Sequence, residues 1–287
     1  MKKLNISLLV LMLIAVASME SFGQEERLTY NENSVYPIPY ANQMYKRTVW
    51  RRMDLKEKQN RPFFSTSNEI TRLIIEAVNN GLIYPYVDDT LNKRMTKEQF
   101  VENLKLPTDE DQFGGPAADA GFGDEAAAPA GTDWSSSGWG DEQTDKPKEQ
   151  FYDATQLNIV RIKEDMIFDK VRSRLYWDIQ SIELIIPATE VATGIEKTVG
   201  VFKFKDLEQL FRSMPDRAIW YNRQNTAQHR NMADAFLLRL FSARVVKVSN
   251  PQDDWIQDLV PDLKSALIKS QEEEHKLIEY EHNLWEY

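Results

Sequence analysis

The stretch RIKEDMIFDKVRSRLYWDIQSIELII, residues 161–186, gives the clearest indication of the fold. It is rich in β-branched and aromatic side chains, and apolar and polar positions alternate in part of it, as along residues 167–177. This pattern is typical of strands that bury one face. We therefore predict strands over residues 157–162, 167–177, 179–186 and 199–204.

The segments between and after these strands predict turns and helices. The charged residues 163–165 suit a hairpin turn, and the sequence around Gly194 suits a longer connection. Asp206 can cap a short helix that runs to Phe211, residues 226–241 form the strongest helical pattern after it, and residues 245–248 return as a strand. Strands grouped together with helices gathered after them favour an α+β fold with an antiparallel sheet.

The amino-terminal half, residues 24–107, predicts a small helical region. Residues 66–80 carry an apolar stripe of helical period, with a capping box from Thr66 to Glu69 and Gly81 at the end. A second capping box, Thr96 to Gln99, leads into a shorter helix. Residues 49–55 are compatible with a strand or with part of a helix.

The block of residues 108–149 differs in composition from the rest of the chain. It holds seven of the eleven glycines, and eleven acidic residues stand against two lysines. Such a segment buries too little apolar area to offset the entropy of ordering, so we predict a disordered acidic linker between two folded halves. Trp134 and Trp139 within it are compatible with a short recognition motif, although two isolated aromatics in a tether are the favoured interpretation.

The first 23 residues predict a signal peptide. Two lysines precede an apolar run over residues 8–17, and small side chains stand before a cleavage position between Gly23 and Gln24. No other apolar run is long enough to cross a membrane as a helix, and the chain has no cysteine for a lipid anchor or a disulfide. We expect a mature protein with no direct membrane insertion, held in place by protein contacts.

The tail, residues 263–287, predicts an acidic helix with an interrupted apolar stripe. It suits either an arm that orders against a neighbouring subunit or a simple surface helix. The acidic residues gather in the linker and in the tail, whereas residues 150–262 predict the α+β domain between them. Because the acidic residues gather in the linker and the tail, we do not expect nucleic acid as a partner.

Few residues suit catalysis or metal binding. His275, Glu279 and His282 share one helical face, but within a run of glutamates, so we expect no metal site there. Glu164 and Asp165 lie close to Asp169 in sequence, and we interpret them as solvated or ion-paired rather than as catalytic carboxylates. The sequence contains no phosphate-binding loop and no nucleophile motif, so we expect no cofactor.

Three segments resemble signature segments of the GldN/PorN family of the gliding motility and type IX secretion machinery. They are residues 161–174 (RIKEDMIFDKVRSR), residues 220–250 (WYNRQNTAQHRNMADAFLLRLFSARVVKVSN) and residues 49–64 (VWRRMDLKEKQNRPFF). The resemblance implies that the protein is not an enzyme but a periplasmic structural component, peripheral to the outer membrane, that forms rings with a GldK/PorK-like lipoprotein. It also implies contact with a GldM/PorM-like motor subunit, and with a GldL/PorL-like one as a further partner.

A free periplasmic hydrolase or substrate chaperone is the alternative function. For the assembly component, aromatic and arginine side chains are the expected partner anchors. Asn225 is expected to cap the helix that follows it, whereas the roles of the neighbouring arginines stay open. The candidate partner interface consists of Trp134, Trp139, Trp220, Arg223, Arg230, Trp255 and Trp285.

Overall fold

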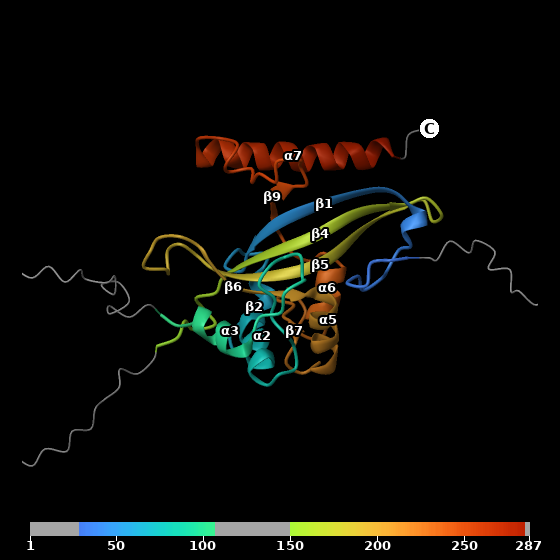
Figure 1. Ribbon diagram of the computed structural model, residues 1–287. Helices are drawn as coiled ribbons and strands as arrows, with labels where there is room; N and C mark the ends of the chain where they lie inside the picture. Colours follow the sequence, from blue (N-terminus) through green and yellow to red (C-terminus); the bar gives the residue numbers. More distant parts are fainter. Residues whose placement is uncertain (1–28, 107–149, 285–287) are drawn as a thin grey trace, which may run out of the picture.

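The computed structural model describes residues 29–106 and 150–284. Its centre is one antiparallel sheet of five strands in the order β6-β5-β4-β1-β9 (Figure 1). The strands are β1 (Gln43–Asp54), β4 (Ile159–Asp169), β5 (Arg174–Ile186), β6 (Lys197–Lys203) and β9 (Arg244–Val248). Helices pack around this sheet, so the predicted α+β class is confirmed.

Strand β1 joins the two described ranges into one sheet. It pairs with β4 on one side and with β9 on the other, which also resolves residues 49–55 as mainly strand. The main apolar core likewise combines Ile74 and Phe100 from the first range with Phe202 and Phe236 from the second. The shared sheet and core correct the expectation of two separately folded halves.

The hairpin turn of β4 and β5 lies at residues 170–173, so the turn predicted at residues 163–165 is wrong. The strand predicted over residues 167–177 is wrong for the same reason, because it spans the end of β4, the turn and the start of β5. Asp169 closes the true turn by accepting a hydrogen bond from the backbone N–H of Val171 at 2.8 Å. Ser173 adopts a positive φ of 50° there.

Two helices of the first range lie against the core. α2 spans Ile70–Asn79 and α3 spans Lys97–Asn103. The capping box of Thr96 and Gln99 and the left-handed Gly81 are confirmed. Helix α2 starts four residues later than predicted, because β2 (Phe64–Ser65) and β3 (Asn68–Glu69) form a small hairpin in front of it. The predicted capping box at Thr66 is therefore wrong.

Two helices of the second range differ from the prediction. α5 spans Phe204–Ser213, which is longer than predicted, and its N-cap is Lys203, so the cap predicted at Asp206 is wrong. α6 spans only Met232–Leu237, and its N-cap is Asn231, so the helix over residues 226–241 and the cap at Asn225 are wrong. The hairpin of β7 (Ile219–Trp220) and β8 (Arg230–Asn231) occupies the preceding sequence. Short 3-10 turns stand at Tyr40–Asn42 and Arg61–Phe63.

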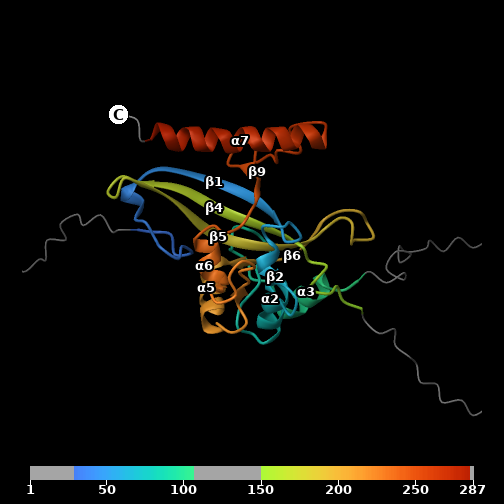
Figure 2. The same ribbon diagram turned by 180° about the vertical axis from the view of Figure 1, so that it is seen from behind.

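The last helix, α7, spans Leu263–Asn283, as the tail pattern predicts. Both views place it at one end of the molecule, with the sheet between it and the helices α2, α5 and α6 (Figures 1 and 2). It packs on β9, the strand at one edge of the sheet. Among the described residues, no helix combines the length and apolar character that a membrane span requires.

Candidate partner-binding site

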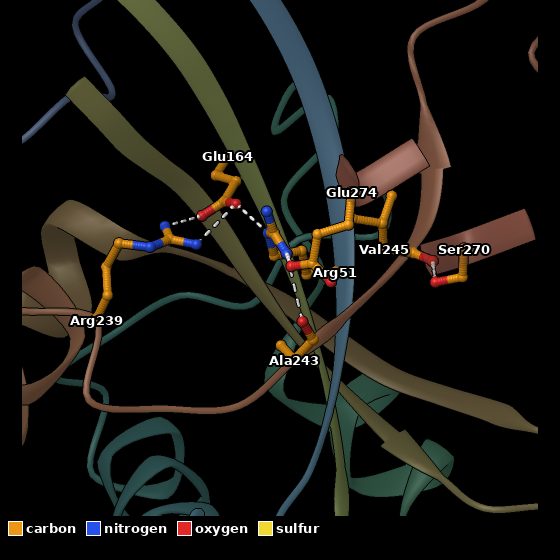
Figure 3. A network of polar contacts seen from close by, with 7 residues as sticks. All are labelled: Arg51, Glu164, Arg239, Ala243, Val245, Ser270 and Glu274. Carbon is orange, nitrogen blue, oxygen red and sulfur yellow. Dashed lines mark hydrogen bonds and ion pairs between the residues drawn. The ribbon is translucent and has the colours of Figure 1, made fainter. Parts of the chain in front are cut away.

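A buried carboxylate on β4 holds two arginines from distant parts of the chain. Glu164 is fully buried, and its Oε1 accepts a hydrogen bond from Nε of Arg51 on β1 at 2.5 Å. Its Oε2 accepts one from Nη1 of Arg239, just after α6, also at 2.5 Å. Figure 3 shows the carboxylate between the two guanidinium groups. These short charged contacts offset the large cost of burying the carboxylate.

The place of this ion pair follows from the period of two along a strand. Ile162, Glu164 and Met166 share one face of β4. Ile162 belongs to the main core, whereas Met166 belongs to a smaller apolar cluster that includes Leu277 of α7. Glu164 therefore lies where the two clusters meet.

An aromatic ring completes the enclosure of the two arginines. The guanidinium carbon of Arg51 lies 5.2 Å from the ring centroid of Trp177, and that of Arg239 lies 4.7 Å from the same ring. Such cation–π contacts gain strength when water is excluded. Arg239 reaches this position with a positive φ of 54°, which places its side chain at the end of α6. The ring and the carboxylate together fix both guanidinium groups.

Arg51 also connects this cluster to α7. Its Nη1 donates to Oε1 of Glu274 at 2.9 Å and to the carbonyl oxygen of Ala243 at 3.4 Å (Figure 3). The cluster thus contains two arginines and two glutamates, so its formal charges balance. One guanidinium links β1, β4, the segment before β9 and the last helix.

Further contacts hold α7 along its middle and last turns. The hydroxyl of Ser270 donates to the carbonyl oxygen of Val245, as Figure 3 shows. Tyr280 stacks on Tyr45 of β1 with ring centroids 4.2 Å apart. Leu277 is buried against the smaller apolar cluster. These contacts order one side of α7 on the edge of the sheet.

The remaining surface of α7 carries several exposed large apolar side chains. They are Leu263, Leu267, Ile268, Ile278 and Tyr280. Single exposed apolar residues are common, but several along one helix are typical of an interaction surface. Whether α7 contacts a neighbouring subunit stays a prediction.

Three of the residues that the sequence analysis proposed as partner anchors lie together at the β7–β8 hairpin. Trp220 of β7 pairs with Arg230 of β8, and the exposed Arg223 lies in the loop between them. The loop is ordered by Tyr221 against His229, whose ring centroids are 4.6 Å apart. The Nε1 of Trp220 is buried and has no hydrogen-bond partner within the described ranges. The hairpin therefore presents two arginines beside a half-buried tryptophan.

Trp255 lies elsewhere, in a ladder of alternating rings and cations. Arg161 lies 4.6 Å and Lys247 lies 4.8 Å from the ring centroid of Trp255, and Lys247 also lies 4.7 Å from that of Trp50. Both cations belong to strands of the sheet, so the ring is held by the chain itself. Among the described residues, the ring contacts of Trp255 are with Arg161 and Lys247 and not with the β7–β8 hairpin.

A cavity of about 540 Å³ borders this ladder. Its cations already have acidic partners. The pairs are Arg161 with Glu183 at 2.8 Å, Lys163 with Asp89 at 3.3 Å and Lys247 with Asp253 at 2.6 Å. Because the charges are satisfied within the chain, the cavity does not favour an anionic ligand.

The other residues of the sequence-based predictions lie outside the described ranges. These are Gly23 and Gln24 at the predicted cleavage position, Trp134 and Trp139 in the predicted linker, and Trp285. Their roles stay predictions.

The carboxylates near Glu164 in sequence have structural partners of their own. Asp165 accepts from the hydroxyl of Thr48 at 2.6 Å and pairs with Lys46 at 2.9 Å. Asp169 pairs with Arg172 at 2.9 Å beside the turn that it closes. They are therefore ion-paired as predicted, but buried rather than solvated.

No geometry suited to a metal ion is present in the described ranges. There, no group of three or more His, Cys, Asp or Glu side chains is placed to hold one. This includes the trio His275, Glu279 and His282 on α7.

Nearby on the sheet, Asp178 has a strongly altered acidity. Burial raises the pKa of Asp178 to about 6, and the charge of Asp165 adds to the rise. A hydrogen bond from Nε2 of Gln180 at 2.6 Å opposes it by stabilising the carboxylate. Asp178 therefore titrates in a range where most carboxylates are already ionised.

The sequence analysis missed the residues that anchor α7. Arg51, Glu164, Arg239 and Glu274 form the network, yet Glu164 was assigned to a turn and the other three were not singled out. One sequence pattern could have identified Glu164 as part of the network. Glu164 interrupts an alternating apolar face between Ile162 and Met166, which indicates a buried charge that needs a partner.

Comparison with known proteins identifies one family. The sequence model of the family described as "Gliding motility associated protein GldN" matches residues 38–286. This range includes all the elements of the sheet and the whole of α7. A search of curated proteins gave no match.

Proposed function

Because the chain belongs to the GldN family of gliding motility components, we propose that it is a non-enzymatic structural subunit of the type IX secretion and gliding machinery. In this proposal it resides in the periplasm and forms rings with a GldK/PorK-like outer-membrane lipoprotein. It also contacts a GldM/PorM-like motor subunit, with a GldL/PorL-like subunit as a further neighbour. The family match is the observation that carries the proposal.

Two features of the described structure support a role in assembly. The buried network at Glu164 and the shared core make the body rigid, as a subunit that transmits contact or force needs to be. The exposed apolar side chains of α7 and the arginines of the β7–β8 hairpin offer surfaces for neighbours. A rigid body with surfaces of this kind suits a component that is completed by partners.

Co-purification tests the proposal. We expect the mature chain, residues 24–287, to elute with an affinity-tagged GldK-like lipoprotein at constant ratio through size exclusion. A tagged lipoprotein of unrelated function serves as the control for non-specific capture. Elution of the chain alone, over a range of salt and protein concentrations, would remove the structural assignment and favour the hydrolase or chaperone alternative.

A further inference from the structure

An open apolar groove separates the first turns of α7 from the edge of the sheet. It encloses about 280 Å³. Its walls include Val246 of β9, Trp255 and Ile256 on one side, and Leu263, Ala266 and Leu267 of α7 on the other. The groove lies before Ser270, which is where the helix first touches β9 through a hydrogen bond.

The apolar wall on α7 is exposed in the described chain. Leu263 is 82% exposed and Leu267 is 47% exposed. Burying such side chains yields about 25 cal/mol for each Å² of apolar area removed from water. The groove therefore has the character of a site that gains stability when an apolar side chain enters it.

A basic residue, Arg244, also lines the groove. The charges of Glu57, Glu196 and Asp54 act on its guanidinium, although within residues 29–106 and 150–284 none of these acids forms a close ion pair with it. Partial enclosure lowers the pKa of Arg244 and the charge of Arg52 lowers it further, whereas the charges of these three acids act in the opposite direction. Arg161 and Lys247 of the same sheet form close ion pairs, whereas Arg244 forms none within the described ranges, so an acidic group of another copy can approach it.

We propose that this groove binds residues 284–287 of a second copy of the chain, with Trp285 between the apolar walls and Glu286 paired with Arg244. The segment LWEY places an aromatic side chain directly beside a carboxylate. Tryptophan and arginine are the residues that most often dominate the energy of protein interfaces. The groove supplies the matching apolar walls and the matching charge.

The occupant comes from another copy because the chain's own segment is too far away. Residues 267 and 284 are 17 helical positions apart, so the groove and the end of α7 are separated by about 25 Å. Three residues span at most about 10 Å. The segment after Leu284 therefore does not reach the groove of its own chain while α7 is helical.

The contact joins different surfaces of the two copies. Each copy offers one groove and one terminal segment, so copies add head to tail and the series closes into a ring when the rotation between them allows it. This inference deepens the proposed function and rests on it, because it names the surfaces through which copies within a ring meet.

Charge exchange tests the contact. The variants Arg244→Glu and Glu286→Lys are each made in the chain of residues 24–287. The control is Lys93→Glu, because Lys93 is exposed and does not line the groove. By sedimentation velocity, the wild type and the control are expected to gain mass with concentration, and each single variant to associate at least about tenfold more weakly. An equal mixture of the two variants is expected to regain the wild-type mass, because both contacts are then attractive.

An apolar substitution and a peptide test the same site without relying on charge. Trp285→Ala is expected to weaken association as much as Arg244→Glu, whereas Ile268→Ala, which does not line the groove, is expected to leave it unchanged. An acetylated and amidated peptide of residues 280–287 is expected to reduce the mass of the wild type, and the same peptide with alanine at position 285 is not. Circular dichroism checks that each variant is folded.

Three outcomes would overturn the proposal. A wild type that stays monomeric up to about 100 times the concentration used for purification removes the contact. A mixture of the two charge variants that does not regain mass shows that Arg244 and Glu286 do not meet. Loss of lipoprotein binding by Arg244→Glu, with self-association unchanged, assigns the groove to the lipoprotein instead. The lipoprotein co-purification is read separately, so failure of this contact and failure of the proposed function are distinguishable.

Discussion

Glu164 and Arg51, which lie on neighbouring strands and 113 positions apart in the sequence, form a buried ion pair with a distance of 2.5 Å between Oε1 and Nε. The same carboxylate holds Arg239, and the same guanidinium holds Glu274 of α7. One charged pair therefore connects the central sheet to the two segments that flank β9. Substitutions in this network and in α7 should distinguish the stability of the central sheet from the attachment of α7 to it.

Replacing Glu164 should destabilise the whole fold. In Glu164→Gln, two arginines lose their shared charge partner inside the protein, and breaking a buried pair costs about 3–5 kcal/mol. The matched control is Glu76→Gln, which breaks an exposed pair with Arg217 and should cost less than about 1 kcal/mol. Urea unfolding of both variants measures the difference. Equal midpoints for the two variants would contradict the role of Glu164.

Replacing Leu277 should loosen α7 without unfolding the sheet. Leu277 is buried in the small cluster, so Leu277→Ala should cost about 2 kcal/mol, at the low end for such substitutions. The adjacent Ile278→Ala is the control, because Ile278 is 57% exposed. Hydrogen exchange is expected to become faster in residues 263–283 of the first variant alone. Equal acceleration in β4 would show that α7 and the sheet unfold as one unit.

Asp178 should make stability fall as pH rises. Its pKa is about 6 in the folded chain and about 4 when unfolded. Between these values the folded state binds more protons, so its contribution to the free energy of unfolding is present below pH 4 and is lost as pH rises through 6. In Asp178→Asn this slope should disappear, whereas the exposed Asp216→Asn should keep it. Urea midpoints from pH 4 to 7 report the slope, and an unchanged slope in Asp178→Asn would contradict the assignment.

Residues 107–149 should be replaceable by a short turn. The backbone N–H of Leu106 donates to the carbonyl oxygen of Gln150 at 2.9 Å, so the chain leaves and returns at one place. A loop of four residues such as Gly-Asn-Gly-Ser can join these ends. The shortened chain is expected to keep the circular dichroism spectrum of its folded elements and a similar urea midpoint. Loss of strand signal would show that residues 107–149 take part in the core.

The elements that follow local rules were predictable from the sequence. The capping box at Thr96 and the left-handed Gly81 depend on neighbouring residues, and both are confirmed. The strand at residues 244–248 and the helix of the tail were also identified from their own patterns. These features need no information about distant parts of the chain.

The errors come from pairings that the local sequence pattern does not reveal. Residues 163–165 read as a turn because they are charged, yet Arg51 and Arg239 satisfy Glu164 within the strand. Residues 226–241 read as one helix because their apolar spacing is helical. The pairing of Trp220 with Arg230 instead uses part of that sequence for a hairpin. In the first place long-range ion pairs overrode local propensity, and in the second place strand pairing within a hairpin did so.

The candidate site was predictable only in part for the same reason. Trp220, Arg223 and Arg230 were found because aromatic and arginine residues cluster in the sequence, and the structure brings them to one hairpin. The charged network beneath α7 was missed, because its members lie on four separate segments. Only the fold brings them together.

The most direct test of the central claim, that this chain is a structural subunit of a larger assembly, is the mass and shape of the particle formed on co-expression with a GldK-like lipoprotein. Multi-angle light scattering followed by electron microscopy of the purified material provides both. We predict closed particles that contain both proteins at a fixed ratio and are many times heavier than one pair. A chain that remains a separate monomer under every salt and concentration tested would contradict the account.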